Sequence, residues 1–118
     1  MKKVLVIDDN EDILTMLKTF LVINGYAVMV SLSCEEGLDI FYSFQPDLVL
    51  LDINVGSSDG RNVCRKIKAQ AEYQHIPVIL ISANSDGLES YADCGANAAI
   101  EKPFNFYHLR TLLDTSTQ

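Results

Sequence analysis

Five short apolar segments alternate along the chain with longer stretches of helical character. The apolar segments are Val4 to Ile7, Tyr26 to Val30, Leu48 to Leu51, Val78 to Ile81 and Ala98 to Ile100. Four of them lack clean alternation, which is typical of strands covered by helices on both faces. The second, Tyr26 to Val30, alternates more, which favours a place nearer an edge of the sheet. We interpret all five segments as β-strands.

Between these segments, apolar residues recur every three or four positions, the spacing of a helix with one buried face. The first stretch, Ile13 to Leu21, is followed by Asn24-Gly25, a pair typical of a helix C-terminus. Four more stripes lie near residues 38–42, 63–67, 88–92 and 109–113, and the stripe at 88–92 is the weakest. Strict alternation of strand and helix predicts a parallel sheet in a doubly wound α/β sandwich, with five helices on its two faces.

Composition narrows the class of protein. The chain has 118 residues, 48% hydrophobic and 21% charged, which predicts one compact domain over residues 1–118. Its net charge of −7 disfavours direct nucleic-acid binding, because phosphate backbones need clustered Lys and Arg. No apolar leader with a cleavage site follows Met1, so we expect a cytoplasmic location without membrane insertion. The three cysteines lack metal-type spacing and are interpreted as reduced.

Polar residues follow four of the five predicted strands. Asp8 and Asp9 come after the first, Asp52 ends the third, Ser82 ends the fourth, and Lys102 follows the fifth. In an open parallel sheet, ligands bind beyond the carboxyl ends of the strands. We therefore expect three carboxylates, a hydroxyl and an ammonium to converge on one edge of the sheet.

Such a group of residues suits phosphoryl transfer. Clustered carboxylates repel one another, and a hard divalent cation relieves the repulsion; Mg²⁺ suits a shallow site with few carboxylates. Phosphoryl transfer requires an in-line nucleophile, a metal ion and positive charge near the equatorial oxygens. Asp52 is the candidate nucleophile, Asp9 the candidate metal ligand, and Lys102 and Ser82 the candidate contacts to phosphoryl oxygens. Asp8 would act directly or through a water molecule, and the carbonyl of Asn54 would complete the metal shell.

Four blocks of this sequence resemble the receiver domain of response regulators in two-component signalling. They read VLVIDDNED, DLVLLDINVGSSDGRNVCRKI, PVILISA and GANAAIEKPF, and together they span the chain from about Lys2 to the last helix. The blocks occur in the order and at roughly the spacing of that family, which makes the combination far more specific than any one block. The resemblance implies a flavodoxin-like sheet of strand order 2-1-3-4-5.

The resemblance also implies a function. Asp52 would receive a phosphoryl group from a sensor histidine kinase or a phosphotransfer protein, with Mg²⁺, or Mn²⁺ in its place, held by Asp8, Asp9, Asp52 and the Asn54 carbonyl. The domain would catalyse its own phosphorylation and dephosphorylation, turn over no external metabolite, and change its affinity for an unknown downstream partner. A cis bond between Lys102 and Pro103 is a further implication.

Some features of the sequence depart from the family pattern, and other positions are ones where the family varies. Ala99 stands three residues before the lysine, where the family usually has Tyr or Phe, so the familiar rotation of an aromatic ring cannot transmit the signal. The segment between Ser82 and Lys102 is about two residues short, which predicts a trimmed or displaced fourth helix. Gly56 replaces a common proline and predicts a more flexible loop. Asn54 and either Asn84 or Ser85 occupy positions where the family tunes phosphate hydrolysis.

Other interpretations stay open at this point. Asp9 or Asn10 could serve only as an N-cap of the first helix. A phosphatase with an aspartyl nucleophile would need a second carboxylate two residues after Asp52, where this chain has Asn54. A phosphate-independent interaction module is the main alternative, and Ala99 favours it.

Overall fold

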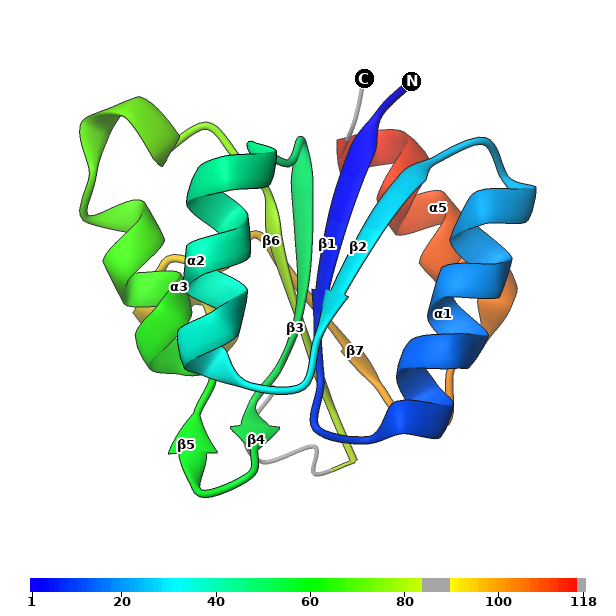
Figure 1. Cartoon of the computed structure of the whole chain (residues 1–118), viewed down its shortest axis with the longest axis horizontal. Helices are drawn as coiled ribbons and strands as arrows, with labels where there is room; N and C mark the ends of the chain where they lie inside the picture. Colours follow the sequence, from blue (N-terminus) through cyan, green and yellow to red (C-terminus); the bar gives the residue numbers. More distant parts are fainter. Residues whose placement is uncertain (84–89, 117–118) are drawn as a thin grey trace.

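The computed structural model describes residues 1–83 and 90–116 (Figure 1). Four α-helices lie within these residues: α1 (Glu11–Ile23), α2 (Cys34–Phe44), α3 (Arg61–Lys68) and α5 (Phe106–Ser116). The main strands are β1 (Lys3–Ile7), β2 (Ala27–Ser31), β3 (Leu48–Asp52), β6 (Val78–Ser82) and β7 (Ala98–Glu101). The shorter elements are β4 (Asn54–Val55), β5 (Ser58–Asp59), and the 3-10 helices η1 (Ala71–Tyr73) and η2 (Tyr91–Cys94).

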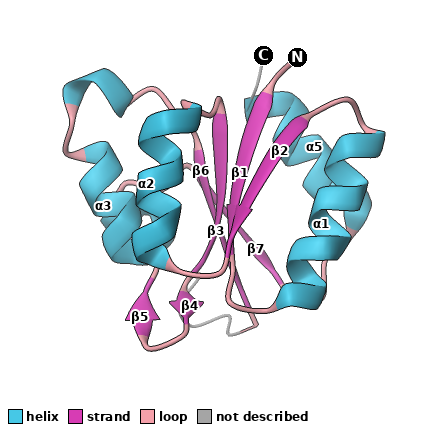
Figure 2. Ribbon diagram, in the orientation of Figure 1, coloured by secondary structure: helices cyan, strands magenta, loops and turns pink. Residues whose placement is uncertain are grey.

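The five main strands form one parallel sheet in the order β2-β1-β3-β6-β7. This is the predicted order 2-1-3-4-5, and the alternating strand β2 does lie at an edge. Helices α2 and α3 cover one face of the sheet, and α1 and α5 cover the other (Figures 1 and 2). The doubly wound fold predicted from the sequence is therefore confirmed.

Two apolar layers hold the helices against the sheet. Alternate residues of β1 point to opposite faces, so Leu5 and Ile7 pack with α2 and α3, whereas Val4 and Val6 pack with α1 and α5. Strands β3 and β6 are buried at every position, which explains their continuous apolar sequences. Both helix-covered faces of the central strands are thus closed to water.

The ends of α1 follow from local sequence. The side chain of Asn10 accepts hydrogen bonds from the backbone N–H groups of Asp12 and Ile13, which makes Asn10 the N-cap. Asn24 is the C-cap, and Gly25 follows it with a φ of 89°, a conformation that suits glycine. The predicted end of this helix is confirmed, and its start leaves Asp9 outside the helix.

Two segments between the main elements differ from the prediction. The two-residue strands β4 and β5 form an antiparallel hairpin directly after β3, which the sequence analysis did not foresee. The predicted fourth helix begins at Leu88, which lies outside the described residues; its described part, Tyr91–Cys94, is a 3-10 helix. Throughout residues 1–83 and 90–116, no helix has both the length and the apolar character that crossing a membrane requires.

Phe41 is the largest fully buried side chain of the described core, and its ring meets that of Tyr73 edge-on at 5.0 Å. Phe41→Ala removes this packing, so we expect the free energy of unfolding to fall by about 3–5 kcal/mol. Urea denaturation at pH 7 measures the change. Tyr107→Ala, at a side chain that is 88% exposed, is the control and should stay within about 0.5 kcal/mol of the native chain.

Candidate functional site

Two buried carboxylates lie side by side at the carboxyl edge of the sheet. Strands β1 and β3 pair in parallel with Ile7 opposite Leu51, so Asp8 and Asp52 come next on neighbouring strands. Asp8 is 0% exposed and Asp52 is 5% exposed. Two buried negative charges this close require a positive partner.

Lys102 supplies that positive charge. Its Nζ lies 2.8 Å from Oδ2 of Asp8 and 2.9 Å from Oδ2 of Asp52. Its backbone N–H donates to the carbonyl of Ser82 at the end of β6, and the predicted cis bond to Pro103 is present. Lys102 therefore makes direct contact with Asp8 and Asp52, two of the carboxylates predicted at this edge of the sheet.

Backbone amides satisfy the remaining carboxylate oxygens. The N–H of Asn10 donates to Oδ1 of Asp8 at 2.9 Å, and the N–H of Asn54 donates to Oδ1 of Asp52 at 3.1 Å. Each buried carboxylate thus has one oxygen on Lys102 and the other on an amide two residues along its own chain. This double anchoring fixes the orientation of both groups.

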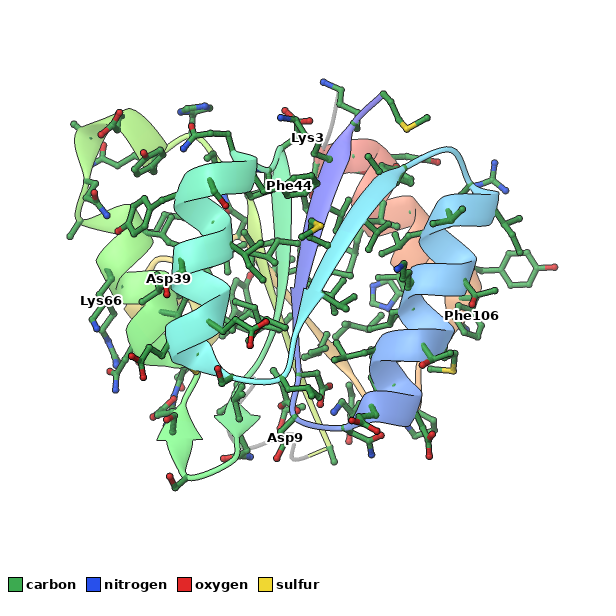
Figure 3. All side chains as sticks on the ribbon, in the orientation of Figure 1. Lys3, Asp9, Asp39, Phe44, Lys66 and Phe106 are labelled. Atoms are coloured by element: carbon green, nitrogen blue, oxygen red, sulfur yellow. The ribbon has the colours of Figure 1, made fainter. Side chains whose placement is uncertain are left out.

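Asp9 completes the acidic group but differs from the other two carboxylates. Its side chain is exposed, and Oδ2 accepts a hydrogen bond of 2.9 Å from the backbone N–H of Gly56. Figure 3 shows Asp9 at the end of the molecule where β4 and β5 project. Because Asn10 is the N-cap of α1, the interpretation of Asp9 as that cap is wrong.

The titration of the paired groups reflects both burial and pairing. Burial raises the pKa of Asp8 above its ordinary value, although hydrogen bonds from Lys102 and from the Asn10 amide act in the opposite direction. Burial lowers the pKa of Lys102, but its hydrogen bonds to Asp8 and Asp52 outweigh burial and leave that pKa raised. The raised pKa of Lys102 favours its charged ammonium form. The raised pKa of Asp8 means that burial makes its ionised form less favourable.

The group of carboxylates fits a divalent cation. One side-chain oxygen from each of Asp8, Asp9 and Asp52 lies within 4.8 Å of the others. The described residues around them place one ammonium, that of Lys102, against three negative charges. Hard cations such as Mg²⁺ prefer oxygen ligands of this kind, with water completing the shell.

The remaining candidates lie at the same edge. Ser82 is the last residue of β6 and is 1% exposed. Asn54 is the first residue of β4, and its backbone N–H is already bound to Asp52. The roles of the Ser82 hydroxyl and the Asn54 carbonyl stay predictions. Asn84 and Ser85 lie outside the described residues.

Gly60 is a residue of the site that the sequence analysis missed. A Cβ atom at this position would collide with the backbone carbonyl of Asp52. Its own N–H donates to the carbonyl of Ile53 at 2.6 Å, which closes the base of the β4–β5 hairpin. The signal in the sequence was Asp59-Gly60 just before the apolar stripe of α3, a combination typical of a tight turn.

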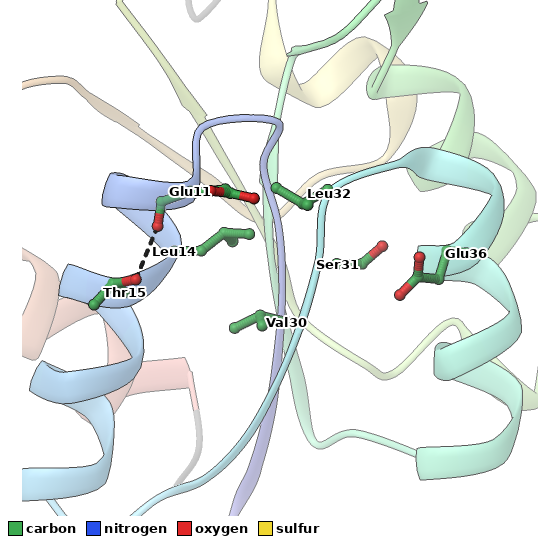
Figure 4. Close-up of a pocket in the computed structure, with 7 residues that line it drawn as sticks. All are labelled: Glu11, Leu14, Thr15, Val30, Ser31, Leu32 and Glu36. Atoms are coloured by element: carbon green, nitrogen blue, oxygen red, sulfur yellow. Dashed lines mark hydrogen bonds between the residues drawn. The ribbon is translucent and has the colours of Figure 1, made fainter.

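A cavity of about 390 Å³ lies beside the site, between α1 and the segment that joins β2 to α2 (Figure 4). Its lining includes Leu14 and Leu32, together with the carboxylates of Glu11 and Glu36. None of the three clustered aspartates lines it. The acidic group is therefore separate from this cavity.

Comparison with known proteins agrees with this geometry. The family model described as the response regulator receiver domain matches residues 4–114. The transcriptional regulatory protein YxdJ of Bacillus subtilis is 36% identical over 108 residues, which are 90% of this chain and 46% of that protein. The probable transcriptional regulator ycf27 of Porphyridium aerugineum is 37% identical over 106 residues, 88% of this chain and 43% of that protein. The chain thus spans less than half the length of these relatives.

Solved structures show the same fold. The receiver domain of NtrX from Brucella abortus superposes with a TM-score of 0.87 at 30% identity, covering 97% of both chains. A putative response regulator from Chloroflexus aurantiacus J-10-fl gives a TM-score of 0.92 at 24% identity, covering 98% of this chain and 97% of that one. At this lower identity the likeness shows the fold alone.

The sheet order defines a flavodoxin-like α/β fold with an acidic group at its carboxyl edge. The family match over residues 4–114 makes the assignment specific. The chain belongs to the response regulator receiver domain family of two-component signalling.

Removing the ammonium should destabilise the fold. Lys102→Met leaves Asp8 and Asp52 buried without their positive partner, so we expect the free energy of unfolding at pH 7 to fall by about 3–5 kcal/mol. Urea denaturation measures the loss, which should shrink when Mg²⁺ is added. Lys66→Met, at an exposed lysine on α3, should change stability by less than about 0.5 kcal/mol. Equal effects of the two variants would contradict this account.

Removing the Asp8 charge should have the opposite effect. Because the pKa of Asp8 is raised in the folded chain, the folded state binds its proton more tightly than the unfolded chain does. The native chain therefore loses stability as the pH rises from the ordinary carboxyl pKa through the raised one. We expect Asp8→Asn to increase the free energy of unfolding at pH 7 and to lose this advantage near pH 3. Denaturation curves at the two pH values test the sign.

Proposed function

We propose that the chain is a phosphoryl-accepting signalling domain in which Asp52 receives the phosphoryl group with the help of Mg²⁺, or of Mn²⁺ in its place. The observation that carries the proposal is the contact of one ammonium, Lys102, with Asp8 and Asp52, while Asp9 brings a third carboxylate within 4.8 Å. Phosphoryl transfer requires this combination of nucleophile, metal ligands and positive charge.

The side chains have distinct parts in the reaction. A carboxylate oxygen of Asp52 attacks phosphorus, and an acyl phosphate forms as the bond from phosphorus to the donor breaks. Lys102 moves its hydrogen bond from the carboxylates to a phosphoryl oxygen, and Ser82 contacts another. Asp9, Asp52 and the Asn54 carbonyl would hold the cation, with Asp8 acting directly or through a water molecule, and the cation would neutralise charge on the phosphoryl oxygens.

The donor we propose is a phosphohistidine on a sensor histidine kinase or a phosphotransfer protein, as family membership supports. The chain modifies itself and turns over no external metabolite. The names of its relatives support a transcriptional output, which a downstream protein or output domain would provide. The net charge of −7 disfavours DNA contact by these residues themselves. The location we propose is the cytoplasm.

A phosphate-independent interaction module is the second candidate, and Ala99 favours it. Ala99 lies on β7 and packs against the apolar layer beneath α2 and α3. Ala99 has no aromatic ring that could rotate when Asp52 gains charge. If the domain switches, the loops around Ser82 and the β4–β5 hairpin must transmit the change.

The two candidates make opposite predictions for chemical phosphorylation. We expect intact mass to rise by one phosphoryl group when the native chain is incubated with Mg²⁺ and acetyl phosphate. The gain should vanish in Asp52→Asn and in the presence of a chelator, and it should persist in Asp39→Asn, which removes an exposed carboxylate on α2.

A chain that gains no phosphoryl group from acetyl phosphate is next given a phosphohistidine donor. If the mass is still unchanged, the phosphoryl-accepting proposal is wrong and the interaction module stands. Binding of a partner that is equal for the native and phosphorylated chains would also favour that module.

A further inference from the structure

Asp9 is the exposed member of the acidic group, and its orientation needs an explanation. Asp8 and Asp52 are each held by Lys102 and by a backbone amide. Asp9 makes no ion pair with Lys102, and the helix cap beside it is provided by Asn10. An exposed carboxylate on a loop would otherwise rotate freely and pay an entropic cost on binding a cation.

The backbone N–H of Gly56 restrains this carboxylate. It donates to Oδ2 of Asp9 at 2.9 Å, across 47 positions of sequence. A hydrogen bond from an amide to a carboxylate is stronger than one between neutral groups. With Oδ2 held in this way, Oδ1 of Asp9 stays available to a cation.

The hairpin presents this amide as a fixed donor. Gly56 occupies the first turn position between β4 and β5, with a φ of 61° that glycine adopts without strain. At the base of the hairpin, Gly60 donates to the carbonyl of Ile53. Asp59 is held by the Arg61 side chain through contacts of 2.7 to 3.2 Å. The hairpin is therefore closed at its base and tied to the first residue of α3.

We propose that Gly56 is a positioning residue for the divalent cation, acting through its backbone N–H on Asp9. The inference rests on the proposed function and deepens it, since it assigns one determinant of cation affinity to the β4–β5 hairpin. Hydrogen bonds to metal ligands commonly change metal affinity by about 10-fold to 100-fold when they are removed. The loss of this N–H should weaken cation binding by about 10-fold or more.

Three variants separate the effect of the N–H from the effect of backbone strain. An amide-to-ester replacement at the Val55–Gly56 linkage removes the N–H and keeps a flexible glycolate. Gly56→Pro also lacks the N–H but forces φ toward negative values. Gly56→Ala keeps the N–H and strains the positive φ, while its Cβ meets nothing within 4 Å. Thermal unfolding of all three shows whether each is folded.

Cation affinity is read out without any phosphoryl donor. Free Mn²⁺ is followed by electron paramagnetic resonance during titration, and Mg²⁺ is titrated against the backbone amide signals of the ¹⁵N-labelled chain. We expect the ester and Gly56→Pro to bind each cation about 10-fold more weakly than the native chain, and Gly56→Ala to bind within about 3-fold of it.

Three other outcomes overturn the inference, and they are distinguishable. Native affinity in the ester chain would show that the amide does not position Asp9. Equal weakening in Gly56→Ala and in the ester would attribute the effect to the shape of the turn. A native chain that binds neither Mn²⁺ nor Mg²⁺ would instead remove the metal site, and with it the proposed function.

Discussion

The ammonium of Lys102 is the group on which the functional edge depends, because it joins two carboxylates that could not otherwise be buried together. Asp8 and Asp52 are held apart from water by the helices on both faces of the sheet, and in the described structure Lys102 bridges them at 2.8 and 2.9 Å. The bridge costs desolvation of three charged groups. The site thus keeps charged groups buried at a cost in free energy. Such groups are common at functional sites, where their ionisation is perturbed.

The sheet brings these groups together without any contribution from loop length. Parallel strands end at the same edge, so residues at or just after the carboxyl ends of β1, β3, β6 and β7 become neighbours although they are far apart in sequence. Each strand is buried for a reason independent of the site, namely its apolar side chains. The same apolar pattern that builds the core therefore also sets the positions of Asp8, Asp52, Ser82 and Lys102.

This relation explains how much could be predicted from the sequence. The burial of β3 and β6 and the edge shared by Asp8, Asp52 and Lys102 follow from apolar periodicity and the rules for parallel sheets. The strand order was implied only by the resemblance to a known family. The hairpin of β4 and β5 was not predicted, because two-residue strands carry no periodic signal. The bond from Gly56 to Asp9 was also missed, since a backbone N–H has the same appearance at every position of a sequence. Loop flexibility had been inferred from Gly56, whereas the structure gives this glycine a specific contact.

Ala99 and Gly60 illustrate two different limits of prediction from sequence. The departure at Ala99 is visible in the sequence, but its effect on signalling depends on motions that no apolar pattern encodes. The need for glycine at position 60 is invisible until the carbonyl of Asp52 is seen against it. At position 60 the lack of a Cβ atom makes room for the Asp52 carbonyl. At position 99 the lack of an aromatic ring removes the ring rotation that the family usually has.

The bridge of Lys102 also has a consequence for the order of synthesis. Lys102 is 94 positions from Asp8 and 50 from Asp52, so a growing chain can make these contacts only long after both aspartates have been synthesised. Strands β1 and β3 exist in the nascent chain well before Lys102 emerges, and their acidic ends then have no ammonium between them. Non-local contacts of this kind form late and cooperatively. A nascent chain from which Lys102 has not yet emerged therefore has Asp8 and Asp52 without the ammonium that pairs with them in the folded structure.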